Sequence, residues 1–372
     1  MKTSSFDYHL PKRLIAQSPI RPRDHSRLLV LDRKTGQLEH QYFYELLALL
    51  RPGDVLVFNN SKVFKARLWG KKQTGGKIEV FLLRQIKSSV WEVLIGGRGG
   101  NVGLKVNFGQ TLSGEIIKQQ DSIRLMRFSL SGKRLQDEID ALGAVPLPPY
   151  IKSSARLEQY QTVYAKKRGS AAAPTAGLHF TKRLLRALKK KGVQLEYVTL
   201  HVGLGTFQPI KTDKIEDHRL HSELATIDQK TAKRLNRAKR EGRRIIAVGT
   251  TTVRTLEESA LLSLRANPPL RRMKRSQPEA GHPLGGNPRI KPRDRHVASL
   301  LAMTGKDTNL YITPGYKFKF VDALLTNFHL PQSSLLVLAS AFASHKKIMA
   351  AYQTAISKKY RFYSFGDAML II

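Results

Sequence analysis

A chain of 372 residues with 41% hydrophobic residues can bury the core of one large domain and a smaller one. Its 64 Lys and Arg against 28 Asp and Glu give a net charge of +36, which favours nucleic acid as the partner over an anionic membrane. The lack of cysteine excludes disulfides and thiolate chemistry. Neither a signal sequence nor an apolar run of the roughly 20 residues that a membrane span needs is present, so the expected location is the cytoplasm.

The first 60 residues predict short elements that lead into one buried strand. Residues 26–43 have the pattern of two strands around a glycine turn, and residues 43–50 have the pattern of a short helix. The run DVLVFNN, residues 54–60, is first apolar and then polar. We therefore expect a buried strand that ends in a polar loop.

Between residues 61 and 145 the hydrophobic period changes to two. Six short runs alternate apolar and polar residues and are separated by glycine turns: KARLWGKK, GKIEVFLLR, VWEVLIGG, LKVNFG, LSGEIIKQ and IRLMRFSL. Six short strands without a long helix indicate a small antiparallel β-barrel. We expect an α/β (mixed α+β) fold, in which residues 1–60 and 146–372 form a discontinuous catalytic domain and residues 61–145 an inserted barrel domain.

Helix and strand patterns alternate after a proline-rich connector at residues 146–150, which is typical of an α/β domain. The predicted helices span residues 181–191, 225–241, 253–264 and a long region from 333 to at least 347, and the predicted strands span 197–201, 245–248 and 324–328. Residues 265–295 differ, because nine Lys or Arg and six prolines accompany only Glu279 and Asp294. This basic segment cannot pack a core and is predicted to be disordered, either as an arm that binds RNA phosphates or as a tolerated insertion.

Two segments place a histidine among small residues. GSAAAPTAGLHFT, residues 169–181, sets Thr175 and His179 at a helix start, which suits an anionic or polar ligand. In TLHVGLGTFQP, residues 199–209, a strand leads from His201 to Gly203, Gly205 and Thr206, and α/β folds bind ligands at such strand ends. The alternatives are a loop that only needs small residues and an ordinary turn.

Three further groups of polar residues follow predicted strands. Thr250, Thr251, Thr252 and Arg254 lie at a helix start and could hold a carboxylate or phosphate, or could form a helix cap with an exposed arginine. Asn59, Asn60, Asn327 and His329 could recognise a base or ribose edge, or could serve turn geometry. His218 lies in HRLHSE, whose spacing matches no strong zinc pattern, so a hydrogen-bonding or acid–base role is favoured over a metal.

Taken in chain order, these segments resemble one family closely, the S-adenosylmethionine:tRNA ribosyltransferase-isomerases of queuosine biosynthesis. The resemblance rests on FDYHLPKRLIAQSP, GDVLVFNNSKVFKARL, GAVPLPPYI, YQTVYAKKRGSAAAPTAGLHFT, VTLHVGLGTFQPI, EDHRLHSE, IAVGTTTVRTLE, LLTNFHLPQSSLLVL and YRFYSFGDAMLI. It spans nearly the whole chain.

The resemblance implies an enzyme that transfers and isomerises the ribosyl part of S-adenosylmethionine. The acceptor would be 7-aminomethyl-7-deazaguanine at the wobble position of a tRNA, and the products would be epoxyqueuosine, adenine and methionine. S-adenosylmethionine would be a consumed co-substrate, so no cofactor and no metal are expected. The partners would be this tRNA and S-adenosylmethionine, with no membrane, and the protein is expected to be a monomer.

The resemblance also suggests roles for the residues in the matching motifs. His179 and His201 are the first candidates for base or acid, because histidine titrates near neutral pH, and Thr175, Thr206 and His218 come next. The remaining candidates are Arg254 with Thr250, Thr251 and Thr252 for the methionine carboxylate, Asn59, Asn60, Gly203, Gly205, Asn327 and His329 for ribose or base, and Arg27, Lys62 and Arg67 for tRNA phosphates.

Two other classes of protein fit parts of the sequence. A non-catalytic RNA-binding protein would explain the charge, but not the glycine, threonine and histidine loops at predicted strand ends. An S-adenosylmethionine methyltransferase would normally carry a glycine-rich loop after its first strand, whereas the N-terminal strands here lead into a barrel. The products distinguish the enzymes, because a methyltransferase leaves S-adenosylhomocysteine.

Overall fold

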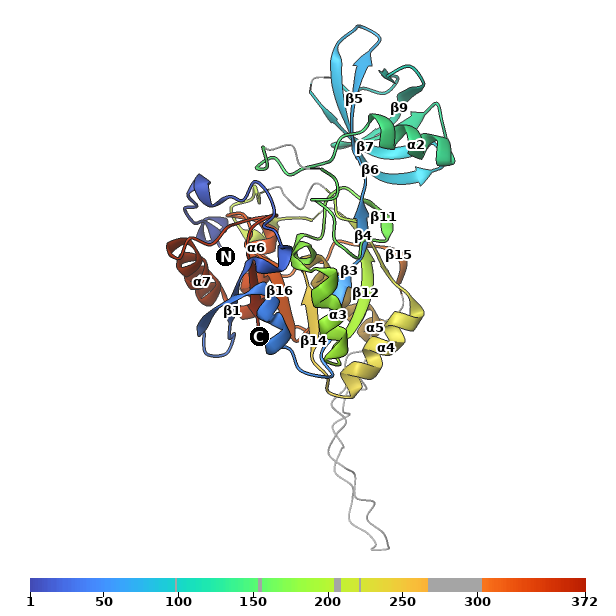
Figure 1. Ribbon diagram of the computed structural model, residues 1–372. Coiled ribbons are helices and arrows are strands. Elements are labelled where there is room, and N and C mark those ends of the chain that lie inside the picture. Colours follow the sequence, from blue (N-terminus) through green and yellow to red (C-terminus); the bar gives the residue numbers. More distant parts are fainter. Residues whose placement is uncertain (98, 153–155, 204–208, 221, 267–302) are drawn as a thin grey trace, which may run out of the picture.

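A computed structural model describes residues 1–372 except 98, 153–155, 204–208, 221 and 267–302. It has a large α/β body and, at the top of Figure 1, a small closed barrel. The predicted fold class is confirmed. Most of the basic segment 265–295 lies outside the described residues, and its first two residues end a helix of the α/β body.

The α/β body is built on a nine-stranded sheet in the order β15-β13-β12-β3-β14-β16-β17-β1-β2. The strands are β1 Arg27–Leu31, β2 Leu38–Tyr42, β3 Val55–Asn59, β12 Gln194–Leu200, β13 Glu223–Ile227, β14 Ile245–Val248, β15 Met303–Thr308, β16 Ala323–Asn327 and β17 Ala368–Ile371. The four strands β12, β3, β14 and β16 run parallel. Every residue of β3 is buried, as expected of a parallel strand covered on both faces.

Helices cover the two faces of this sheet. They are α1 Leu46–Leu49, α3 Lys182–Lys190, α4 Gln229–Arg240, α5 Thr250–Ala266, α6 Ser334–Ala343 and α7 His345–Ser357. Side chains alternate along β3, so that Val55 and Val57 pack with α4 to α7, while Leu56 and Phe58 pack with α1 and α3. The result is a three-layer α/β/α arrangement.

The barrel closes in the order β10-β7-β6-β5-β8-β9. Its six strands, all predicted, are β5 Arg67–Lys72, β6 Lys77–Lys87, β7 Val90–Gly96, β8 Lys105–Phe108, β9 Leu112–Gln120 and β10 Ile123–Phe128. Helix α2, Gly132–Leu142, is not predicted by the sequence pattern, and it buries Leu135 and Ile139 against the barrel core. Before the barrel, β4 Ser61–Val63 pairs in parallel with β11 Lys167–Ser170, next to the α/β body.

Two predicted helices differ from the structure. The helix expected from residue 225 begins at Gln229, because Glu223–Ile227 pairs as β13 with strands on both sides and Asp228 then caps α4. The long helix expected from residue 333 is two helices, since Ser344 has a φ of 79° that no α-helix accommodates. The other predicted helices and strands lie within a few residues of their observed bounds.

Helix α5 holds the segment after β15 through a buried carboxylate. Glu257 accepts hydrogen bonds from the backbone N–H groups of Lys319, Phe320 and Val321 at 2.8–3.0 Å, and from the Tyr316 hydroxyl at 2.9 Å. Its side chain is fully buried. One carboxylate thus satisfies three backbone donors, two of which, at Phe320 and Val321, are buried.

Replacing this carboxylate should destabilise the fold. In Glu257→Ala the three backbone donors lose their acceptor, so we expect the free energy of unfolding to fall by about 3–5 kcal/mol. Urea denaturation followed by circular dichroism measures this change. The neighbouring Glu258→Ala serves as the control and should cost less than about 1 kcal/mol. Equal losses in the two variants would contradict the role of Glu257.

Candidate active site

A cavity of about 640 Å³ lies where the barrel meets the β13–β15 edge of the sheet. Its volume is that of a typical small-molecule site. Both walls mix apolar and polar side chains. The barrel contributes Leu83, Trp91, Leu94 and Ile123 together with polar residues such as Arg84 and Glu92. The α/β body contributes Arg168, His201, Glu223, Arg254 and Tyr311 together with apolar residues such as Leu224 and Leu338.

An ion-pair cluster joins the two walls of this cavity. Arg84 on β6 contacts Glu92 of the barrel and, at 2.9 Å, Asp307 of β15. Both Arg84 and Asp307 are more than a third exposed, so the pair adds little stability. It does connect barrel strand β6 to sheet strand β15 beside the cavity.

His201 follows directly after β12 and lines the cavity. Gly169, which has a φ of +142°, lies so close that a Cβ there would be 2.8 Å from the imidazole ring. Within the described part of the chain, His201 Nδ1 is buried without a hydrogen-bond partner. Burial lowers the pKa of His201 below its ordinary value, so the ring is neutral at pH 7 and can accept a proton.

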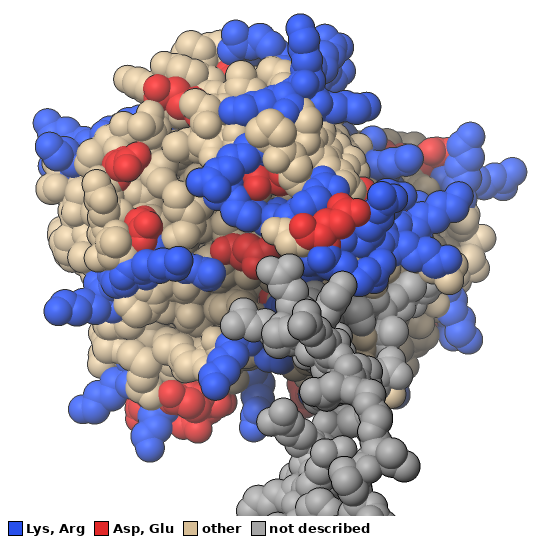
Figure 2. Space-filling model, turned by 90° about the horizontal axis from the view of Figure 1, so that it is seen from below, with Lys and Arg blue, Asp and Glu red and all other residues tan. Residues whose placement is uncertain are grey.

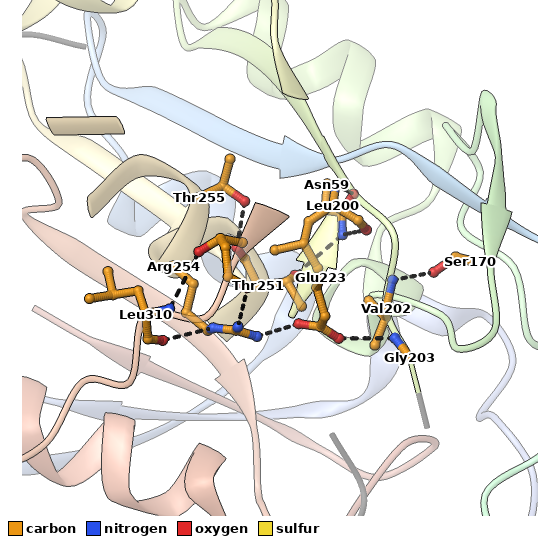
Figure 3. A network of polar contacts seen from close by, with 11 residues as sticks. Asn59, Ser170, Leu200, Val202, Gly203, Glu223, Thr251, Arg254, Thr255 and Leu310 are labelled. Carbon is orange, nitrogen blue, oxygen red and sulfur yellow. Dashed lines mark hydrogen bonds and ion pairs between the residues drawn. The ribbon is translucent and has the colours of Figure 1, made fainter. Parts of the chain in front are cut away.

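A buried ion pair between two residues that line the cavity holds the backbone beside it (Figure 3). Glu223, at the start of β13, pairs with the guanidinium of Arg254 on α5, and its other oxygen accepts from the backbone N–H of Gly203 at 2.9 Å. Arg254 also donates to the carbonyls of Leu310, at 3.1 Å, and Thr308, at 3.4 Å. Both side chains are at most 6% exposed. The guanidinium predicted to bind a carboxylate thus already holds an internal one.

The polar residues around the start of α5 bond mainly to the backbone (Figure 3). Asn59 accepts from the backbone N–H of Leu200 and donates to its carbonyl, which ties β3 to β12. Thr252 donates to Val248, and Thr251 lies 3.4 Å from the Asn59 amide. Thr250 is buried beside them. These contacts match the alternative interpretation of Asn59 as a residue that shapes the strand end.

His179 lies in a second polar cluster, apart from the residues that line the cavity. It ends a short 3₁₀-helix that starts at Thr175, its Nδ1 is 2.7 Å from the Ser26 hydroxyl, and its ring stacks on Phe43. Within the described residues, His179 Nε2 and Asn327 Oδ1 are both buried without a partner. Burial lowers the pKa of His179 to about 3, so this ring is neutral across the physiological range.

The other predicted site residues are dispersed. His329 bonds through Nε2 to Thr326 at 2.7 Å and is buried in the core, which lowers its pKa to about 3. His218 packs edge-on against Tyr311 of the cavity wall. Asn60 accepts a hydrogen bond from the Thr199 hydroxyl.

The three residues predicted to bind tRNA phosphates are spread over the molecule: the Arg27 guanidinium lies over the Tyr360 ring, Lys62 is exposed on β4, and Arg67 pairs with Glu79. Gly205 and Thr206 lie outside the described residues.

Sequence analysis did not single out Glu223, Gly169 or Trp91. Glu223 ends the HRLHSE motif, and its partner Arg254 lies 31 residues further along the chain. Trp91 belongs to a barrel strand, and only the fold brings that strand to the cavity. The sequence carries no local signal for either contact.

Basic side chains outnumber acidic ones on the face of the molecule opposite the barrel (Figure 2). Figure 2 shows Lys and Arg spread over the face opposite the barrel, with Asp and Glu in small groups between them. In the part of the chain that the structure describes, no three His, Asp or Glu side chains gather as a metal site would require. No described helix is long and apolar enough to cross a membrane.

A cavity of this size, lined by a neutral histidine at the junction of an α/β sheet and an inserted barrel, is typical of an enzyme. Comparison with known proteins shows which enzyme family the chain resembles. Residues 3–371 match the family model for queuosine biosynthesis proteins. The chain therefore belongs to the queuosine biosynthesis protein family.

Individual relatives agree over the full length. The chain is 48% identical to the S-adenosylmethionine:tRNA ribosyltransferase-isomerase of Staphylococcus aureus strain Newman and 47% identical to that of strain JH9, with 100% of each chain covered. A crystal structure of S-adenosylmethionine tRNA ribosyltransferase from Thermotoga maritima is 36% identical, with a TM-score of 0.53 over 99% of this chain and 100% of the other.

The buried ion pair should behave as a coupled unit. Arg254→Met leaves the Glu223 carboxylate buried and unpaired, so we expect a loss of about 3–5 kcal/mol in the free energy of unfolding. In Arg254→Met/Glu223→Gln the charge is gone and an acceptor for Gly203 remains, so most of that loss should be recovered. Urea denaturation of Arg254→Met, Glu223→Gln and the double variant measures the coupling.

The exposed pair of Arg237 and Glu241 on α4 supplies the control, since Arg237→Met should cost at most about 1 kcal/mol. A double variant as unstable as the sum of its single variants would refute the coupling. Equilibrium binding of S-adenosylmethionine to the stable double variant then tests the predicted carboxylate contact of Arg254 directly.

Proposed function

We propose that this protein transfers and isomerises the ribosyl group of S-adenosylmethionine onto 7-aminomethyl-7-deazaguanine at the tRNA wobble position. The products are epoxyqueuosine in the tRNA, adenine and methionine. The observation that carries the proposal is the full-length 48% identity to a protein named for this activity. A ligand-sized cavity lined by His201 supports it.

The chemistry starts from the sulfonium of S-adenosylmethionine, which acidifies the adjacent ribose C5′ protons. A neutral imidazole takes one of these protons. The electron pair left on C5′ breaks the C4′–O bond of the ribose ring, and the freed oxygen forms a carbonyl at C1′ as adenine leaves with a proton from the imidazolium. The aminomethyl nitrogen of the tRNA then bonds to C4′ and releases a proton, and C5′ bonds to C1′, which closes the five-membered carbocycle. The oxygen on C1′ finally displaces methionine from C5′ as a neutral thioether and so forms the epoxide. No external oxidant, metal or cofactor takes part in this scheme.

We assign the base to His201 and a supporting role to His179. His201 lines the cavity with its Nδ1 unengaged among the described residues, whereas His179 is fully buried with one nitrogen on Ser26. A pKa of about 3 also makes His179 a weak proton acceptor. The Glu223–Arg254 pair supports the backbone at Gly203, beside the same cavity.

The tRNA is bound, in this proposal, through its phosphates by a chain of net charge +36. Lys62 is exposed near the barrel junction and forms no ion pair with the described residues, whereas Arg67 is paired with Glu79. The reaction is expected in the cytoplasm, where tRNA is modified. That the protein works as a monomer stays a prediction, which analytical ultracentrifugation would check.

Mass spectrometry of a simple incubation tests the function. The protein is mixed with S-adenosylmethionine and an anticodon stem-loop that carries 7-aminomethyl-7-deazaguanine. We expect equimolar adenine and methionine, and a mass gain on the RNA equal to one epoxycyclopentane unit. Formation of S-adenosylhomocysteine would indicate a methyltransferase, and RNA binding without any product would indicate a non-catalytic RNA-binding protein.

The pH dependence of kcat/KM distinguishes the two histidines. Protonation of the base stops the reaction, so activity should be lost as the pH falls through the pKa of the base. For His201 this acid limb lies below 6.5, its ordinary value, because burial lowers the pKa. For His179 it would lie near pH 3.

His201→Ala should lower turnover by at least about a hundredfold and leave tRNA affinity intact, and near-normal turnover would exclude His201.

A further inference from the structure

The free edge of the sheet carries an exposed row of aromatic rings. Tyr42, the last residue of β2, is 49% exposed, and Tyr44 is 38% exposed. Their rings are parallel to within 6° at a centroid separation of 5.5 Å, and the His25 ring lies 5.2 Å from that of Tyr44 at a tilt of 56°. We call these three residues the aromatic strip. Large exposed side chains aligned in this way offer flat faces to a partner.

Cationic side chains border the aromatic strip. Arg27 lies directly across from Tyr42 in the β1–β2 pairing, and its guanidinium is 3.7 Å from the centre of the Tyr360 ring. Lys358 and Lys359 are exposed beside Tyr360. Two acidic groups contact this surface through the backbone: Glu45 accepts from the N–H of Tyr42, and the buried Asp367 accepts from the N–H of Arg27. Stacking faces and positive charge are therefore combined on one surface.

This surface is remote from the cavity. The cavity lies at the β13–β15 edge, whereas β2 is the last strand at the opposite edge, and Figure 1 shows β15 and β1 on opposite sides of the α/β body. Eight strand spacings of about 4.8 Å separate the two edges, or roughly 38 Å. A small substrate in the cavity cannot reach the strip, but a folded RNA can.

We propose that the aromatic strip is a second RNA-binding surface, which stacks unpaired bases of the tRNA outside its anticodon stem-loop. Aromatic faces bind unpaired bases of any sequence, and neighbouring cations bind the phosphates between them. The large positive net charge of the chain favours RNA over a protein partner for these tyrosines. This inference rests on the proposed tRNA substrate.

Three variants test the strip. Tyr42→Ala/Tyr44→Ala removes the stacking faces, Tyr42→Phe/Tyr44→Phe keeps them, and Trp69→Ala removes an aromatic side chain that is 60% exposed on the barrel. Dissociation constants are measured by fluorescence anisotropy for full-length tRNA and for its isolated anticodon stem-loop. The alanine double variant should bind full-length tRNA roughly tenfold more weakly and the stem-loop as wild type does. The phenylalanine double variant and Trp69→Ala should match wild type on both RNAs.

Each other outcome overturns a defined part of the proposal. Unchanged affinity of the alanine double variant for full-length tRNA would exclude the strip as an RNA surface and leave a protein partner for it. An equal loss on the stem-loop would exclude a remote contact, and a loss in the phenylalanine variant would exclude stacking. Wild-type protein that binds neither RNA would overturn the proposed function itself, together with this inference.

Discussion

The contact on which the cavity depends is the buried ion pair between Glu223 and Arg254. Two opposite charges in a low-dielectric interior are stable only together and only with their remaining hydrogen bonds satisfied. The structure meets this condition with backbone groups: Gly203 donates to the carboxylate, and Leu310 and Thr308 accept from the guanidinium. One pair therefore joins four chain segments at the cavity, namely β13, α5, Gly203 and residues 308–310, and specificity of arrangement is its main contribution.

Helix α5 carries two buried charged side chains whose hydrogen bonds are made mostly to backbone groups. Arg254 and Glu257 are three residues apart, and both buried charges hydrogen-bond to backbone groups of the chain from the end of β15 onward, at residues 308–310 and 319–321. Because the chain leaves α5 at Ala266 and re-enters the described structure at Met303, both flanks of the basic insertion are anchored on the same helix. Closure of a longer loop costs little extra entropy, so the fold can accept such an insertion there.

The sequence predicted what depends on local pattern. The barrel strands, β1 to β3, β14 and α3 follow from hydrophobic period and turn residues. Strand β13 was wrongly predicted as the start of a helix, because five residues carry too little period to outweigh the helical pattern after Gln229. The approach of Gly169 to His201 brings together residues that are far apart in the sequence, and so does the position of Trp91 in the cavity lining. No local pattern encodes such contacts.

The two candidate histidines show why spatial context decides chemical role. Both lie in glycine-containing motifs and both are neutral, but His179 is sealed between Phe43 and Ser26, while His201 borders a cavity. Complete burial that lowers a pKa to about 3 also removes the driving force for proton abstraction. Partial burial, as at His201, keeps the ring neutral at pH 7 and still basic enough to accept a proton. The position of His201 at the cavity is therefore the observation on which the proposed assignment of the base rests.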